Sequence, residues 1–131
     1  MVKEKMEEVF AGKYCITQSE LYARISQCVA VGVKSKQNGL AHMHYNTKLN
    51  MLEEFLEEAF NGGIISICGG VDAFVPQLGF ISGRKNADRV LESICKKGLE
   101  KYIKEMDIYT DQIREMYILN SSIQIFRKNI Y

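Results

Sequence analysis

The sequence Ser-Gln-Cys-Val-Ala-Val-Gly-Val occupies residues 26–33 and predicts a β-strand, because valine alternates with small residues along it. Alternation places the three valines on one face of the strand and Cys28 on the other. Residues 34–38 are polar and turn-like, and residues 39–45 predict a second strand. We therefore expect a β-hairpin with a buried valine face and a second face that carries the cysteine.

Two helices are expected in the middle of the chain. The first covers residues 47–60, where apolar side chains recur at helical spacing, and Asn46 suits its N-cap. The second covers residues 86–97, with Asn86 as N-cap and Gly98 at its C-terminal end. Further strands are expected at residues 13–17, 64–68, 99–108, 116–119 and 123–126.

The overall composition bounds the fold. The chain has 131 residues, of which 47% are hydrophobic and 25% are charged. These proportions are typical of a soluble globular protein, and the length suits a single domain over residues 1–131. Strands at both ends with helices between them predict an α+β fold, a layered α/β sandwich with helices packed on a mostly antiparallel or mixed β-sheet.

Charge and hydropathy exclude several classes of function. The formal net charge is +1, so no strong field would attract nucleic acid or an anionic membrane surface. The charged N-terminal residues lack the apolar core of a secretory signal, and no run reaches the roughly 18 apolar residues that a membrane span needs. We expect a cytoplasmic protein with no nucleic-acid partner and no membrane insertion.

The four cysteines are candidates for chemistry, and they are Cys15, Cys28, Cys68 and Cys95. None forms a CxxC pair and no Cys/His cluster has zinc spacing, so we expect no metal and no other cofactor. Disulfides are not expected in a cytoplasmic chain of this size. A free cysteine is by default a small buried apolar side chain, so a reactive one is recognised by its neighbours.

The expected hairpin brings a histidine toward Cys28. A turn centred on Ser35 pairs Cys28 with His42, and a turn centred on Lys36 pairs it with His44. Directly opposed residues have Cβ atoms about 4.5–5.5 Å apart, which lets an imidazole reach a thiol. An imidazole at that distance can take the thiol proton and return it to a leaving group. Both histidines satisfy this geometry, because they lie on the same strand face.

Five short motifs resemble, in order, those of the CheD family of chemoreceptor glutamine deamidases. The two that contain the candidate pair are Cys28-Val29-Ala30-Val31 and Gly39-Leu40-Ala41-His42, which resemble the family's Ser-Cys-Val-Ala-Val and Gly-Met-Ala-His. The other three are Gly12-Lys13-Tyr14, Gly69-Gly70-Val71-Asp72-Ala73-Phe74 and Gly83-Arg84-Lys85-Asn86. The resemblance spans roughly residues 12–127.

The resemblance implies a CheD-like fold and a specific reaction. Cys28 would attack the side-chain carboxamide of a protein glutamine, and ammonia would leave with a proton from His42. The match at the Ala-His position implies His42 rather than His44. The implied substrates are chemoreceptor glutamines in chemotaxis, and the implied binding partner is a CheC-type phosphatase.

The segment before Cys28 departs from the family pattern Thr-x-Gly-x-Gly-Ser. Residues 22–27 are Tyr-Ala-Arg-Ile-Ser-Gln, so Tyr22 occupies the position of the threonine that assists the pair. Tyr22 and Ser26 are therefore the candidate third catalytic residues. Cys68, next to Gly69-Gly70, is the rival nucleophile. Two alternative functions stay open: a catalytically weakened binding module that engages a CheC-type phosphatase, and a deamidase with a different protein target.

Overall fold

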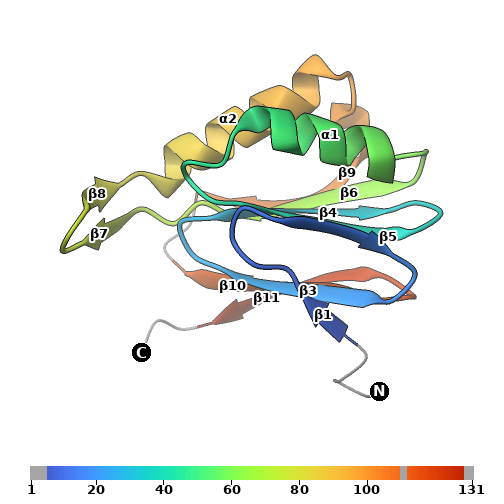
Figure 1. Ribbon diagram of the computed structural model, residues 1–131, viewed down its shortest axis with the longest axis horizontal. Helices are drawn as coiled ribbons and strands as arrows, with labels where there is room; N and C mark the ends of the chain where they lie inside the picture. Colours follow the sequence, from blue (N-terminus) through green and yellow to red (C-terminus); the bar gives the residue numbers. More distant parts are fainter. Residues whose placement is uncertain (1–5, 110–111, 129–131) are drawn as a thin grey trace.

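The computed structural model describes residues 6–109 and 112–128, and in this part of the chain the elements form three layers (Figure 1). Two α-helices cover one face of a five-stranded sheet, and a four-stranded sheet lies against its other face. The expected α+β sandwich is therefore confirmed, with a second stacked sheet that the sequence analysis did not anticipate.

The central layer is the five-stranded sheet. Its strand order is β2 (Tyr14–Thr17), β5 (Asn38–Met43), β4 (Val29–Lys34), β6 (Ile64–Gly69) and β9 (Ile103–Ile108). The pairs β2–β5, β5–β4 and β4–β6 are antiparallel, and β6–β9 is parallel. The short 3-10 helix η2 (Glu100–Tyr102) precedes β9, so the strand expected at residues 99–108 begins later than predicted.

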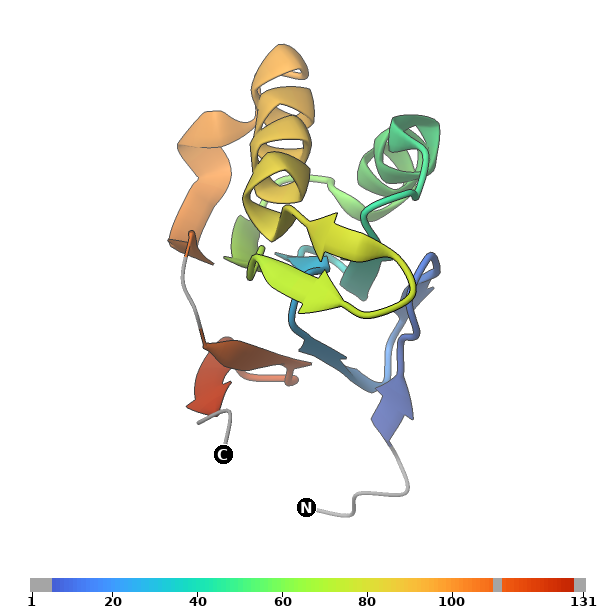
Figure 2. The same cartoon turned by 90° about the vertical axis from the view of Figure 1, so that its left-hand side faces the viewer.

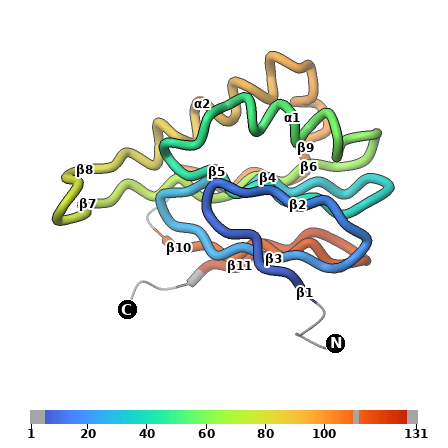
Figure 3. The backbone as a smooth tube through the Cα atoms, in the orientation of Figure 1, coloured from blue at the N-terminus to red at the C-terminus, as the bar shows by residue number. Residues whose placement is uncertain are grey.

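The four-stranded sheet contains β1 (Met6–Glu8), β3 (Glu20–Ile25), β10 (Ile113–Ile118) and β11 (Ile123–Lys128), in that order. The hairpin expected around residues 120–121 is confirmed as β10–β11. The strands β1 and β3 were not predicted, although β3 alternates buried and less buried residues in the way that identifies a strand. The backbone trace shows β1 running beside β3 (Figure 3).

Two helices and a small hairpin complete the fold. Helix α1 (Leu49–Ala59) and helix α2 (Gly83–Lys96) pack on the valine face of the sheet, and β7 (Ala73–Val75) pairs with β8 (Gly79–Ile81) just before α2. Both predicted N-caps are wrong. Helix α1 begins at Leu49 with Lys48 at the N-cap position, and the side-chain oxygen of Asn46 contacts Nδ1 of His44 instead. Helix α2 begins three residues before Asn86, because the Ser82 hydroxyl caps it by accepting a hydrogen bond from the Lys85 N–H.

The alternation in β4 separates two hydrophobic cores. Val29, Val31 and Val33 pack under the helices, whereas Ala30 faces the four-stranded sheet. At Gly32 the sheets approach so closely that an added Cβ would lie 2.6 Å from the Ile118 side chain. Small residues on this face of β4 therefore let the two sheets come into contact.

Candidate active site

Cys28 lies in the bend between β3 and β4, against the segment that leads from β6 to β7. Figure 2 shows the β7–β8 hairpin and the start of α2 at the near end of the molecule. The strand predicted over residues 26–33 is wrong at its beginning, because the chain crosses there from the four-stranded to the five-stranded sheet. The Cys28 carbonyl accepts from the Gly70 N–H at 2.9 Å, and the Ser26 carbonyl accepts from the Val71 N–H at 2.8 Å. These bonds hold the bend against the end of β6.

A glycine makes this close approach feasible. Gly69 has a φ of +115°, a backbone conformation that side chains other than glycine rarely adopt. An added Cβ at this position would lie 2.3 Å from the Cys28 carbonyl oxygen. Gly69 and Gly70 therefore allow the backbone at Cys28 to pack against the end of β6. They do not mark Cys68 as a reactive residue.

His42 is buried on β5, with 6% of its surface exposed, on the face that points toward the four-stranded sheet. Its Nδ1 lies 2.8 Å from the Val9 carbonyl oxygen. A carbonyl only accepts, so Nδ1 carries the ring proton and Nε2 of the neutral imidazole carries a lone pair. Burial lowers the pKa of His42, which keeps the ring neutral near pH 7. The structure therefore supplies a fixed imidazole whose Nε2 can accept a proton.

The Val9 carbonyl is a site group that sequence reasoning missed. It follows β1, and the backbone of Val9 donates in turn to the Tyr22 carbonyl at 2.9 Å. Every residue has a backbone carbonyl, so no side-chain pattern could have identified this one.

The register of the β4–β5 hairpin is the one that a turn centred on Lys36 produces. It pairs Ala30 with His42, and the ladder begins at Val29 opposite Met43. Cys28 therefore lies two residues before the direct partner of His42, with its side chain against the same inter-sheet core. His44 lies beyond the ladder, and its Nδ1 contacts the Asn46 amide oxygen at 2.6 Å.

The thiol and the imidazole do not form an ion pair in this state. Within the described residues, no hydrogen bond joins Cys28 to His42 or His44. Burial raises the pKa of Cys28 to about 11, so its thiol is protonated near neutral pH. The resting site thus holds a neutral thiol and a neutral imidazole. Catalytic hydrogen bonds are often long in unliganded sites and tighten when substrate binds.

The two candidate helpers have their hydroxyl groups engaged elsewhere. Tyr22 donates to the Glu8 carboxylate at 2.9 Å, and its ring stacks on Tyr117. This hydrogen bond to Glu8 raises the pKa of Tyr22. Ser26 donates to the side-chain oxygen of Gln27. Neither hydroxyl is hydrogen-bonded to the Cys28 thiol or to the His42 ring.

The other cysteines have different surroundings. Cys68 is fully buried opposite Ala30, and this burial raises the pKa of its thiol. Cys15 donates to the Glu7 carboxylate at 3.2 Å, and burial together with that contact raises its pKa to about 11. Cys95 is exposed on α2. Cys15 and Cys28 are both partly exposed next to the histidine strand β5 and pack against the same core, but the Cys15 thiol is engaged by the Glu7 carboxylate.

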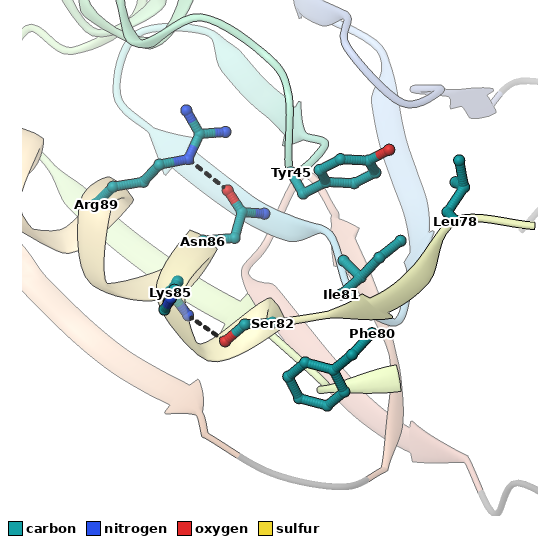
Figure 4. A pocket seen from close by; sticks show the side chains of 8 residues that line it. All are labelled: Tyr45, Leu78, Phe80, Ile81, Ser82, Lys85, Asn86 and Arg89. Atoms are coloured by element: carbon teal, nitrogen blue, oxygen red, sulfur yellow. Dashed lines mark hydrogen bonds between the residues drawn. The ribbon is translucent and has the colours of Figure 1, made fainter. Parts of the chain in front are cut away.

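A pocket of about 470 Å³ opens between the start of α2 and the β7–β8 hairpin (Figure 4). Cys28 and His42 are not among its lining residues, and Asn86, which bonds to the Gln27 carbonyl, connects the pocket to the Cys28 bend. Its lining residues are Tyr45, Leu78, Phe80, Ile81, Ser82, Lys85, Asn86 and Arg89. Phe74, Leu78 and Phe80 are exposed on the hairpin. The pocket combines an apolar wall with two cationic side chains at the start of a helix.

These observations define an α+β sandwich protein with a cysteine and a proton-accepting histidine at one end of its sheets. Among the described residues, no group of three or more side chains of the types that bind metal ions is placed to hold one. No helix in the described ranges is both long and apolar enough to cross a membrane. No family model and no curated protein matches the sequence.

Proposed function

We propose that this chain is a cysteine-dependent protein-glutamine deamidase of the CheD type, which acts on chemoreceptor glutamines in the cytoplasm. The observation that carries the proposal is the His42 ring, whose Nδ1–H is held by the Val9 carbonyl while Nε2 is left as a base. Cys28 lies against the same inter-sheet core, two residues from the strand partner of His42. The ordered motifs that resemble the CheD family supply the substrate class.

The reaction would begin with proton transfer from the Cys28 thiol to Nε2 of His42 as sulfur bonds to the carboxamide carbon. The carbon–nitrogen bond of the resulting tetrahedral adduct then breaks, and the imidazolium gives its proton to the departing amine, which leaves as ammonia. A thioester remains on Cys28. Water then attacks its carbonyl carbon and loses a proton to His42. The carbon–sulfur bond breaks, and the sulfur recovers that proton.

The pocket at the start of α2 favours a macromolecular substrate over a free amino acid. Its apolar wall includes Phe80 and Leu78, which are exposed on the β7–β8 hairpin, and Lys85 also lines it. Exposed apolar groups beside charged ones are typical of a surface that contacts another protein. A glutamine presented by that protein would reach the Cys28 bend from this side.

The direct test is incubation with cytoplasmic chemoreceptor fragments, followed by measurement of ammonia and of the mass change from amide to acid. We expect wild-type protein to convert specific glutamines, Cys28→Ala to abolish conversion, and His42→Asn to lower its rate by roughly 10²–10⁴-fold to a level that can still be measured, because that is the usual contribution of a general base. Cys95→Ala is the matched control, because Cys95 is an exposed cysteine away from the bend. Wild-type protein that releases no more ammonia than Cys28→Ala would contradict the proposal. Conversion of glutamines only in another protein would assign a different target.

A second candidate function is a binding module that engages a CheC-type phosphatase without strong catalysis. The favouring observation is the Cys28 thiol, whose pKa of about 11 leaves it protonated and unpaired with an imidazole. Binding of such a phosphatase that persists in Cys28→Ala, together with no glutamine conversion by wild type, would select this function.

A further inference from the structure

Asn86 lies where the cysteine bend and the histidine strand both meet α2. It is buried on the first turns of the helix, with only 2% of its surface exposed. Its Nδ2 lies 2.8 Å from the Met43 carbonyl oxygen and 3.3 Å from the Gln27 carbonyl oxygen. Met43 directly follows His42, and Gln27 directly precedes Cys28. One amide nitrogen therefore joins the two segments that carry the candidate pair.

The orientation of this amide is fixed by Arg89, one helical turn later. The Arg89 Nε donates to the Asn86 side-chain oxygen at 2.8 Å, a bond that Figure 4 shows. The other guanidinium nitrogens of Arg89 donate to the carbonyls of Thr47 and His44, at 2.6 and 2.8 Å. Because the oxygen of Asn86 is occupied, its NH2 group must face the two carbonyls. A carboxylate or an apolar side chain at this position could not replace both donations.

The strand ladder alone does not set the separation between Cys28 and His42. The ladder begins at Val29, and Cys28 is in the bend outside it. We propose that Asn86 is the positioning residue that sets this separation, by holding the carbonyl next to each member of the pair. This inference rests on the proposed deamidase function. In a regular strand pair, ladder hydrogen bonds would set the separation between two such side chains. Here the buried helix residue Asn86 sets it.

Asn86→Asp and Asn86→Ala test the inference, each in the wild-type and the His42→Ala background. Asn50→Asp is the matched control, because Asn50 is an exposed helix residue on α1. We expect the Asn86 variants to lower kcat for receptor deamidation by about 100-fold in the wild-type background, since misplacement by about 1 Å has that effect. KM should change much less, and the variants should cause no further loss in the His42→Ala background. Circular dichroism confirms folding, and Asn86→Ala serves if Asn86→Asp does not fold.

Each outcome has a distinct meaning. Loss of kcat that disappears when His42 is absent supports a positioning role. Wild-type kcat in either folded Asn86 variant overturns the inference and leaves the proposed function intact. Equal losses of kcat in the wild-type and His42→Ala backgrounds also overturn the inference and leave the proposed function intact. Wild-type protein without glutamine conversion rejects the proposed function, and the inference fails with it.

Discussion

His42 is neutral because it is buried and because one ring nitrogen is committed to a backbone carbonyl. The pKa of this histidine in the folded chain is below its ordinary value of 6.5, mainly through loss of solvent. The unfolded chain therefore binds a proton at a higher pH than the folded chain does. Stability linked to His42 is fully present above about pH 6.5 and is lost as pH falls from there through the folded-state pKa.

Replacement of His42 by asparagine should remove this pH dependence. We expect wild-type protein to lose free energy of unfolding between about pH 7 and about pH 5, and His42→Asn to lose less over that range. Urea unfolding at both values measures the difference. His44→Asn is the control, because His44 is only partly buried. Equal losses in wild type and His42→Asn would show that the buried ring is not the group responsible.

The Cys28 thiol should react slowly with iodoacetamide. A pKa of about 11 leaves on the order of 0.1% of the thiol ionised near pH 8, and the thiolate is the reacting form. We expect Cys28 to be labelled more slowly than exposed Cys95 in the same sample, with a rate that rises steadily as pH approaches 11. Peptide mass spectrometry follows both sites. Rapid labelling of Cys28 near neutral pH would instead indicate a preformed thiolate–imidazolium pair.

At the scale of elements, the start of α2 and the end of β6 depend on backbone contact. Gly83 is the first residue of the helix, and an added Cβ would lie 2.3 Å from the Val71 carbonyl oxygen. Asp72 accepts from the Arg84 N–H at 3.0 Å and from the Ser82 hydroxyl at 3.2 Å. The first turn of α2 thus packs directly on residues 70–72, the loop that follows β6. This contact places Asn86 next to the cysteine bend.

Gly83→Ala should separate the helix start from the loop. The clash involves backbone atoms, which cannot rotate away, so we expect a loss of about 2 kcal/mol in the free energy of unfolding. Chemical denaturation measures the loss. Lys85→Ala, an exposed change in the same turn, should alter stability by less than about 0.5 kcal/mol. If the Gly83→Ala protein is as stable as Lys85→Ala, residues 70–72 shift to make room for the added methyl group, and the prediction is wrong.

At the scale of the whole molecule, an ion pair joins the two sheets. Arg114 on β10 is 1% exposed, and its Nε and Nη2 donate to the two carboxylate oxygens of Asp107 on β9 at 2.6 and 3.1 Å. The hydrogen bond from Arg114 lowers the pKa of Asp107. Arg127 on β11 approaches the same carboxylate at 3.4 Å, but its side chain is 66% exposed. Arg114 is therefore the principal link between the two sheets at this edge.

Arg114→Met should destabilise the fold by about 3 kcal/mol near neutral pH, because it leaves a largely buried carboxylate without its main partner. The stability that the depressed pKa of Asp107 contributes is present above about pH 4 and is lost as pH falls through the folded-state pKa. The difference between wild type and Arg114→Met should therefore shrink toward about pH 3. Urea unfolding at both pH values tests this.

Arg127→Met is the matched control for the same carboxylate. An exposed ion pair contributes little, so we expect a loss of less than about 1 kcal/mol. Similar losses in both arginine variants would contradict a special role for Arg114.

Local side-chain patterns were sufficient for much of the fold. The alternating valines of residues 29–33 predicted a hairpin strand with two different faces, and the helical spacing of apolar residues such as Leu52, Phe55 and Leu56 predicted a helix. Both patterns act between residues close in the chain, so they are visible without tertiary structure. Residue types at hairpin spacing pointed to Cys28 with either His42 or His44, and only the family-like motifs selected His42.

The tertiary structure alone decided the register, the bend at Cys28 and the partners of the site. His42 is oriented by the carbonyl of Val9, which is 33 residues away, and the Cys28 bend is held by Gly70 and Asn86. Asn86 was expected as the N-cap of the second helix, and it is instead a buried residue inside α2 that links two segments. Backbone carbonyls and amides are chemically alike at every residue, so only the packing of distant segments determines which of them meet at the site.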